Sequence, residues 1–481
     1  MRLAAENPQI VPGGHWLQIA RLVPSFGVAQ ALQAITGLLV ARILFPHEYG
    51  LWSLFAVVLF YSAQLHLGSI NLMHKEVPFF LAAKDGRAAE RVTNFAFSLS
   101  LTNCTVVAAA ICAVGWLWRP AGVSFTQVTL LALLVVSQEL FTFVNYWLRA
   151  QGRFSALGDY LNLYACSTLA LVAPLGWWKH LTGVLLAYVL AGSSVSFYFI
   201  FRQRIRVAYR LAAHDGSLPR AFQLLLWTMM FVFLTTVDRV FIGGRLGVMA
   251  LGFFGIALLV SNVVYNTSDV VLQVLFPTAN SLAGSGQSSP EITRLLLNSA
   301  RTLSYILAAI LGLGFLLLPA LVPVILPRYS PGIPAARIVC LGLAPLVLAQ
   351  LISVGLVVMG RVMQCLLLQA AVLMFKLILL LALSHPQLTD VAAVSSLANV
   401  LYLLAVLTAT APLSAWDRLK RLVSLAAPWL LVAVILLIVS LPTSLSASYG
   451  LGVLLPSSLY LVFAPPLLWT VYRRTRGALH V

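Results

Sequence analysis

Between Ile338 and Val358 the sequence reads IVCLGLAPLVLAQLISVGLVV, without a single charged residue. An α-helix of this length reaches about 30 Å, which is the thickness of the hydrocarbon core of a bilayer. Comparable apolar runs recur from one end of the chain to the other. The sequence therefore predicts an all-α polytopic membrane protein.

The composition agrees with this prediction, because hydrophobic residues make up 61% of the 481 positions and charged residues only 9%. A soluble domain is roughly a quarter charged and half apolar, so this chain cannot build a water-soluble surface. We expect about fourteen transmembrane helices. Their expected ranges are 16–43, 49–70, 92–118, 125–148, 154–177, 181–201, 221–243, 248–277, 294–326, 334–359, 362–384, 389–411, 423–441 and 450–472.

The net charge of +17 follows the expected helix ends, and nucleic acid is not needed to explain it. One set of ends carries 20 of the 30 Lys and Arg residues, the opposite set carries 7, and three lie within helices. The richer side is cytoplasmic by the positive-inside rule. We therefore expect a multi-pass protein of the bacterial inner membrane with both termini in the cytoplasm. Anionic membrane lipids are expected partners.

The spacing of the cysteines and the length and sequence of the loops exclude several classes of chemistry. The five cysteines lie within expected helices without CxxC or Cys/His spacing, so we expect neither a disulfide framework nor a metal site. The Gly-rich stretch Gly284-Ser-Gly-Gln-Ser-Ser-Pro290 lacks the Lys-Ser/Thr pair of a phosphate-binding loop. No loop exceeds about twenty residues, which leaves no room for a soluble catalytic domain. We expect no enzyme and no cofactor.

The N-terminus shows no cleavable signal pattern, because a polar stretch leads directly into a full-length first helix. We expect this helix to be retained in the mature protein.

A weak internal repeat divides the chain. The stretch Arg42-Ile-Leu-Phe-Pro-His-Glu-Tyr-Gly50 is similar to Arg245-Leu-Gly-Val-Met-Ala-Leu-Gly252, and Pro78 and Pro277 follow at similar distances. Chance similarity of apolar sequence is the competing explanation. Two halves in the same orientation predict six-helix lobes related by a pseudo-two-fold axis along the membrane normal. The expected domains are residues 1–210, 211–415 and 416–481, the last holding helices 13 and 14 with a cytoplasmic tail.

Cationic side chains at membrane depth are the first candidates for a substrate site, because such groups are costly unless they line a cavity or find partners. Arg301 lies about 10 Å along its helix from Arg294. Lys376 lies about 22 Å along its helix from Arg361. For Arg301 and Lys376, this depth favours a functional role over snorkelling of the side chain to the interface. For the shallower Arg21, the two interpretations are about equally supported. Arg21, Arg301 and Lys376 are the expected substrate-binding cations.

Polar and acidic groups at depth are candidates for ion coupling or for the lining of a polar cavity. These are Glu139, Asp159 and the stripe Asn262, Asn266 and Asp269 at helical spacing on the expected eighth helix. Structural pairing or interhelical hydrogen bonding is the alternative for each.

Landmarks at the helix junctions carry a family resemblance. The first set comprises Leu-Val-Ala-Arg42-Ile-Leu-Phe-Pro46-His-Glu-Tyr49-Gly50, then Leu67-Gly68 and Lys75-Glu76-Val-Pro78. The second set comprises Asp238-Arg239-Val-Phe-Ile-Gly, Leu251-Gly252-Phe-Phe-Gly-Ile-Ala257 and Val274-Leu-Phe-Pro277. In this order they resemble the polysaccharide transporter family, which includes O-antigen flippases, within the multidrug, oligosaccharidyl-lipid and polysaccharide exporter superfamily. We interpret Arg42, Tyr49, Gly50, Asp238, Arg239, Gly252 and Pro277 as lobe-junction or structural residues.

The resemblance implies a flippase that moves an undecaprenyl-pyrophosphate-linked oligosaccharide, such as an O-antigen, capsule or exopolysaccharide unit, from the cytoplasmic to the outer leaflet by alternating access. It implies that cationic residues in a central cavity hold the diphosphate, as the bidentate geometry of arginine allows. A polysaccharide polymerase and a chain-length regulator would be partners. Many such flippases have twelve helices, and helices 13 and 14 resemble the lipid II flippases of the same superfamily instead.

Three other functions are alternatives. A small-molecule or multidrug exporter of the same superfamily would use the deep acidic groups for cationic drugs. A major-facilitator transporter is disfavoured, since Asp238-Arg239-Val-Phe-Ile-Gly-Gly-Arg245 has the wrong spacing and lies on the external side by charge counting. A membrane polymerase or ligase for lipid-linked sugars is disfavoured by the short external loops.

Overall fold

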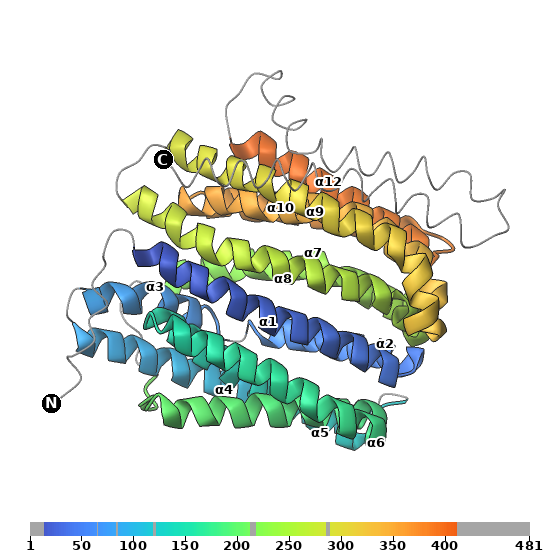
Figure 1. Cartoon of the computed structure of the whole chain (residues 1–481), viewed down its shortest axis with the longest axis horizontal. Helices are drawn as coiled ribbons and strands as arrows, with labels where there is room; N and C mark the ends of the chain where they lie inside the picture. The colour runs from blue at the N-terminus through green and yellow to red at the C-terminus, as the bar shows by residue number, and fades with distance from the viewer. Residues whose placement is uncertain are drawn as a thin grey trace. The chain divides into compact units, whose positions relative to one another are not determined.

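In a computed structural model of the chain, residues 14–64, 66–82, 85–118, 122–211, 218–284 and 289–410 are described (Figure 1). Regular structure within these ranges is helical throughout. The elements are α1 (Gly14–Ile43), α2 (Pro46–Ser62), α3 (Ser69–Ala82), α4 (Gly86–Trp118), α5 (Phe125–Ala150), α6 (Phe154–Arg202), α7 (Leu218–Arg245), α8 (Val248–Gly284), α9 (Ser289–Ile325), the 3-10 helix η1 (Pro327–Gly332), α10 (Ile333–Val358), α11 (Val362–Ala382) and α12 (Leu388–Thr410).

The predicted fold class is confirmed. Within the described residues, nine helices are long and apolar enough to cross a membrane, and a shorter apolar helix covers Gly27–Ile43. The protein is therefore a multi-pass membrane protein. The first twelve predicted ranges correspond to helices, although the range 49–70 is divided between α2 and α3. The predicted helices at 423–441 and 450–472 lie outside the described residues.

Helix α6 contains two of the predicted spans. It runs over 49 residues, but Lys179 and His180 leave the helical conformation, with φ of −129° and +49°. Gly183 lies so close to the carbonyl oxygen of Leu175 that a side chain there would collide with it. The chain therefore reverses between the ranges 154–177 and 181–201 at the position that the sequence predicts.

The second predicted span, 49–70, is interrupted within its length. Helix α2 ends at Ser62 and α3 begins at Ser69, and Leu67 and Gly68 between them have φ of +47° and +80°. The break leaves backbone groups without helical partners, and His66 pairs with one of them. Its Nδ1 accepts a hydrogen bond from the N–H of Gly68 at 3.0 Å. Irregular backbone at membrane depth is tolerated where protein buries it, and His66 is buried.

The chain divides into two compact units, of which unit 1 comprises Met1–Ile43 and Val58–Leu225, and unit 2 comprises Leu44–Val57 and Leu226–Val481. The first part of α2 thus packs in unit 2, and the other described residues up to Leu225 pack in unit 1. In unit 1 the buried core includes Tyr160 and Phe199, whose rings lie 5.0 Å apart.

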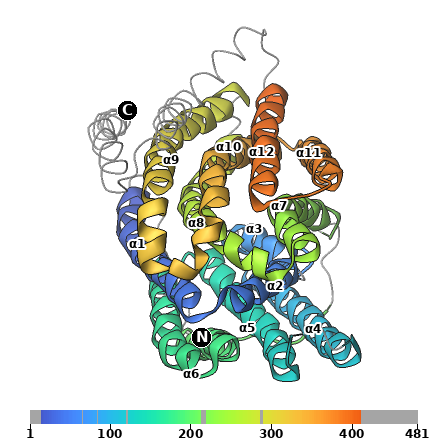
Figure 2. The same ribbon diagram turned by 90° about the vertical axis from the view of Figure 1, so that its right-hand side faces the viewer.

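In unit 2, α10 is the central helix. It packs against α8, α9 and α12, and α11 lies on the far side of α12 (Figure 2). The middle of α10 is buried almost without interruption, from Val339 to Val357. The uncharged stretch Ile338 to Val358 is therefore surrounded by other helices of unit 2.

Candidate functional site

An ion pair inside unit 2 joins helices that lie far apart in the sequence. Nζ of Lys376 on α11 lies 2.8 Å from Oδ1 and 2.9 Å from Oδ2 of Asp238 on α7. It also donates a hydrogen bond to the carbonyl oxygen of Leu234 at 2.9 Å. Lys376 is only 1% exposed. Because the pair is desolvated, its attraction is far stronger than that of a surface pair, and so is the cost of removing one partner.

Helix α12 completes the polar environment of the pair. The hydroxyl of Ser395 donates to Oδ1 of Asp238 at 2.8 Å, and Asn399, one turn further on, donates from Nδ2 to the carbonyl oxygen of Gly342 on α10 at 3.1 Å. Asp238 therefore connects three helices of unit 2.

A cavity of about 40 Å³ adjoins this cluster, and Arg239, Ser261 and Tyr265 contribute further polar groups to its lining. This volume accommodates roughly three water molecules and no sugar ring. In this conformation the cavity can hydrate the ion pair but cannot admit a glycan.

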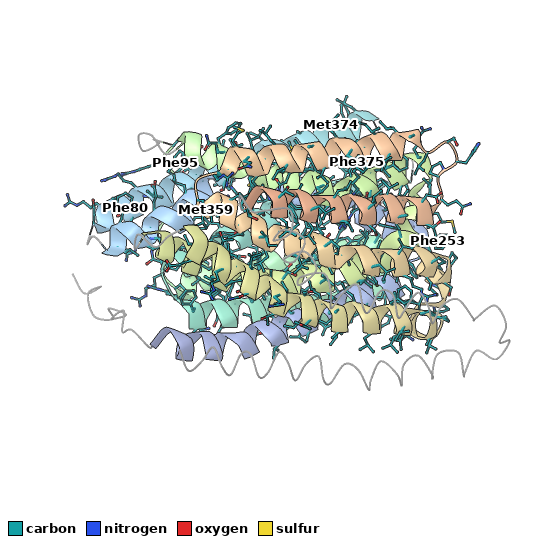
Figure 3. All side chains as sticks on the ribbon, turned by 90° about the horizontal axis from the view of Figure 1, so that it is seen from above. Phe80, Phe95, Phe253, Met359, Met374 and Phe375 are labelled. Atoms are coloured by element: carbon teal, nitrogen blue, oxygen red, sulfur yellow. The ribbon has the colours of Figure 1, made fainter. Side chains whose placement is uncertain are left out.

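The sequence of α11 explains why its lysine points inward. Gln369 and Lys376 are buried, whereas Met374 and Ile378 are 56% and 60% exposed. Figure 3 labels Met374 and Phe375 on this helix. One face of α11 thus offers apolar side chains to lipid, and the opposite face places polar ones inside the unit, as a membrane solvent demands.

Unit 1 holds a different kind of buried group. Glu139 on α5 is 3% exposed, and neither carboxyl oxygen has a hydrogen-bond partner among the described residues. Its polar neighbours are Ser100 and Cys104 of α4. A carboxylate at this place would lack the pairing that a buried charge requires. The side chain is therefore best accommodated in its neutral, protonated form.

The repeated landmarks of the sequence meet at one place in unit 2. A side chain at Gly50 of α2 would collide with the carbonyl oxygen of Val248, the first residue of α8, and one at Gly252 of α8 would collide with the carbonyl oxygen of Pro46, the first residue of α2. Each glycine thus faces the residue four positions before the other. This reciprocal contact is the one that two related halves would make across a two-fold axis.

Aromatic residues reinforce this junction. The ring of Tyr49 lies 5.7 Å from that of Tyr329 of η1 in an edge-to-face arrangement. The hydroxyl of Tyr329 donates to the carbonyl oxygen of Leu44 at 2.8 Å. The structure therefore places Tyr49, Gly50 and Gly252 in packing roles at the start of α2 and α8.

The family of the chain follows from a comparison with known protein families. Residues 39–329 match the family described as "Polysaccharide biosynthesis protein", and this range includes the junction between α2 and α8. The chain belongs to this polysaccharide biosynthesis family. The resemblance inferred from the junction motifs is therefore confirmed. No curated protein matches the sequence significantly.

Solved structures share the fold of this family member. The inward closed conformation of the lipid II flippase MurJ superposes with a TM-score of 0.69 at 12% identity, covering 95% of this chain and 99% of the other. The inward-facing conformation of a multidrug resistance MATE family transporter of the MOP superfamily superposes with a TM-score of 0.62 at 15% identity. The match covers 83% of this chain and 94% of the other.

A third structure comes from Pyrococcus furiosus and is described as a MOP superfamily transporter whose binding pocket has reverse polarity. It gives a TM-score of 0.63 at 14% identity, covering 85% of this chain and 96% of the other. At these identities the three similarities show that this member of the polysaccharide biosynthesis family shares their fold, and no more.

The predicted site residues are dispersed. Arg301 on α9 is half-buried, and its Nε has no hydrogen-bond partner among the described residues. Arg42, Asp159 and Asn262 are exposed. The side chains of Arg21, Asn266, Asp269 and Pro277 lie outside the described residues. Lys376 and Asp238, for which the sequence suggested separate roles, are brought together.

Ser395 and Asn399 are residues of the cluster that the sequence analysis missed. Their spacing of four residues on α12 was a usable signal, since it places both on one helix face. Small polar residues at such spacing are frequent in membrane helices, however. The spacing therefore indicates a site only when the position of Asp238 opposite α12 is known.

Proposed function

We propose that this protein is a flippase that moves an undecaprenyl-pyrophosphate-linked oligosaccharide from the cytoplasmic to the outer leaflet of the bacterial inner membrane by alternating access. The match of residues 39–329 to the polysaccharide biosynthesis family carries this proposal. The similarity of the fold to a lipid II flippase supports it. In this proposal the protein makes and breaks no covalent bond, both termini are cytoplasmic, and a polymerase and a chain-length regulator receive the product.

Arg301 is the cation that we propose to contact the diphosphate. Its side chain is half-buried on a membrane helix, and its Nε has no hydrogen-bond partner among the described residues. A guanidinium suits this role, because its planar fork matches pairs of phosphate oxygens.

Lys376 is the second cation proposed for substrate binding. Its ammonium now lies between Asp238 and the carbonyl oxygen of Leu234, so contact with a phosphate requires this ion pair to open. Its present geometry supports a positioning role, in which α7, α11 and α12 move as one body.

Glu139 is the group that we propose to couple transport to a proton. Its buried carboxyl is accommodated when neutral, and it can ionise only in a conformation that admits water. A change between these conformations would bind and release one proton. Asp159 is exposed and therefore lacks this property.

A small-molecule exporter is the second candidate function. The similarity of the fold to a multidrug resistance transporter favours it. The buried carboxyl of Glu139 would attract a cationic drug only in a conformation in which it ionises. The exporter needs no lipid-linked substrate, and this difference separates the two candidates.

The deciding experiment measures translocation in proteoliposomes containing the full-length protein. A fluorescent undecaprenyl-pyrophosphate oligosaccharide is placed in one leaflet, and its arrival in the other is followed by a membrane-impermeant quencher. Protein-dependent arrival without a change in the glycan supports the flippase. Arg301→Ala should slow arrival at least tenfold, whereas Arg294→Ala, an exposed residue of the same helix, should not.

Absence of translocation for several glycans under an imposed ion gradient would contradict the flippase. Export of a cationic dye by the same proteoliposomes would then favour the small-molecule exporter.

A further inference from the structure

The end of α6 has an unusual residue in its capping turn. The N–H of Arg204 bonds to the carbonyl oxygen of Phe201, and that of Ile205 bonds to the carbonyl oxygen of Ile200, which is the Schellman pattern of a helix C-terminus. Arg204 has a φ of +51°, in the left-handed region that favours glycine. An arginine here costs conformational energy that a glycine would not.

Two other helices in the chain end in the same turn and use glycine. Gly152 after α5 and Gly360 after α10 have φ of +66° and +75°. The residues that follow them make the same hydrogen bond, from the N–H of Arg153 to Leu148 and from that of Arg361 to Leu356. Arg204 therefore departs from the solution that this chain uses elsewhere, and strained residues of this kind are candidates for function.

The segment after the turn is extended and is fixed along α4. The N–H of Ala208 donates to Oδ1 of Asn94 at 2.9 Å, and the N–H of Arg210 donates to Oγ of Ser98 at 2.7 Å. The hydroxyls of Tyr209 and Thr102 lie 2.7 Å apart. Asn94, Ser98 and Thr102 are spaced by four residues, so one ridge of α4 receives the whole segment.

The side chains of this segment alternate between the core and the exterior. Ile205 and Val207 pack against the apolar core of unit 1. Arg204, Arg206 and Arg210 are exposed. We call residues 202–210 the arginine strap, because Arg202 at its start is exposed as well.

The guanidinium groups of the strap have no acidic partners among the residues that the structure describes. None of its four arginines forms an ion pair with a carboxylate of the described residues. Arg202 lies over the rings of Tyr198 and Phe199, at 5.8 and 5.7 Å from their centres. Four exposed positive charges on a fixed backbone, with no carboxylate partner among the described residues, therefore lie close together along the chain and form an electrostatic site for anions.

Exposed aromatic residues place the strap at the membrane surface. Phe201 is 78% exposed, and Phe197 and Tyr198 on the preceding turn are 53% and 50% exposed. Such rings at the end of a spanning helix lie among lipid chains and head groups. The arginines that follow them are then level with the lipid phosphates.

We propose that the arginine strap binds the phosphate groups of anionic phospholipids and so anchors unit 1 to the membrane surface. The partner is a lipid and not the transported substrate, so this proposal goes beyond the proposed function and does not depend on it. A fixed strap loses little conformational freedom on binding, which suits recognition of head groups better than a flexible polybasic tail does.

The test measures lipid binding by the detergent-purified full-length protein. Native mass spectrometry compares phosphatidylglycerol with phosphatidylcholine for the wild type, Arg204→Gly and the double variant Arg206→Gln/Arg210→Gln. The wild type should prefer phosphatidylglycerol. Each arginine removed should weaken its binding about fivefold, since one basic residue at a membrane surface contributes about that much. Arg245→Gln, an exposed arginine at the end of α7, is the matched control and should bind like the wild type.

Arg204→Gly also separates binding from folding. Glycine at position 204 relieves the strained turn. The melting temperature of the Arg204→Gly variant should therefore equal or exceed that of the wild type, while its lipid binding falls. If the melting temperature falls instead, the double variant decides, because the backbone contacts of its strap are unchanged.

Phosphatidylglycerol binding at the wild-type level in both variants would overturn the proposal. So would wild-type protein that is stabilised by inorganic pyrophosphate but does not distinguish the two lipids, since the strap would then serve a diphosphate.

Discussion

Lys376 and Asp238 show, at the scale of the residue, what a membrane interior imposes on charge. The ammonium and the carboxylate neutralise each other inside unit 2, and Ser395 accompanies them. Lys376→Ala leaves the carboxylate buried and unpaired, and we expect it to cost about 3–5 kcal/mol of stability. Thermal unfolding of the purified variant in detergent measures this loss.

A second variant separates charge from packing at this pair. Lys376→Met together with Asp238→Leu removes both charges and keeps apolar volume, so most of the lost stability should return. The corresponding control for charge is Arg361→Ala, which removes an exposed cation next to the same helix and should change stability little. If the Lys376→Ala variant were as stable as the wild type, Lys376 and Asp238 would not form this ion pair in the membrane.

Glu139 leads to a prediction about pH gradients. Glutamine has the shape of a protonated glutamate, so Glu139→Gln should fold with an unchanged melting temperature. It cannot release a proton, and translocation in proteoliposomes should therefore stop responding to an imposed proton gradient while some gradient-independent transport remains. Asp159→Asn, at an exposed carboxylate, should keep the wild-type response. An unchanged response in Glu139→Gln would remove this residue from the coupling scheme.

The sequence predicts that these groups lie deep in the membrane, but it does not predict their partners. Counting residues from the nearest charged helix end places Lys376 and Glu139 inside the membrane. The contact from Lys376 to Asp238 joins positions separated by 138 residues, and no helical period relates them. It depends on how α7, α11 and α12 pack, which the apolar pattern leaves open because lipid and protein interiors are equally apolar.

The junction between α2 and α8 is the clearest feature at the scale of the element. Gly50 and Gly252 let two helix starts approach until backbone meets backbone. A methyl group at either position collides with a carbonyl oxygen, so we expect Gly50→Ala and Gly252→Ala each to cost about 1–3 kcal/mol. Melting temperatures of the two variants check this expectation.

Gly244, near the end of α7, provides the opposite control. A methyl group there meets nothing within 4 Å, and alanine is the better helix former, so Gly244→Ala should be neutral or stabilising. If Gly50→Ala behaved in the same way, the reciprocal contact would not contribute to stability.

The positions of the helices were predictable because each must cross the hydrocarbon layer. Eleven of the twelve predicted spans up to residue 411 fall on helices without a break between two elements, and the span 49–70 falls on α2 and α3. The irregular parts were not predictable. The break at Leu67 and Gly68 lies inside a continuous apolar run, and the arginine strap was expected to be an ordinary loop. Both depend on buried side chains, His66 in one case and Asn94 and Ser98 in the other, that satisfy backbone groups from another part of the chain.

At the scale of the whole molecule, the distribution of charge predicts the orientation in the membrane. The strap lies on the side that carries 20 basic residues, and the start of α5 lies on the side that carries 7. Positive residues are retained in the cytoplasm during insertion, so the strap should be cytoplasmic and the start of α5 external. This arrangement is also the one that a flippase loading its substrate from the cytoplasmic leaflet requires.

Single cysteines test this orientation once the five native cysteines have been replaced. Arg206→Cys and Thr126→Cys both lie at exposed positions. A membrane-impermeant maleimide should label Thr126→Cys but not Arg206→Cys in intact spheroplasts, and the reverse in inverted vesicles. The opposite pattern would place the strap outside the cell. Loading from the cytoplasmic leaflet would then have to occur at the end of the molecule that is poor in positive charge, where an anionic diphosphate has the least reason to bind.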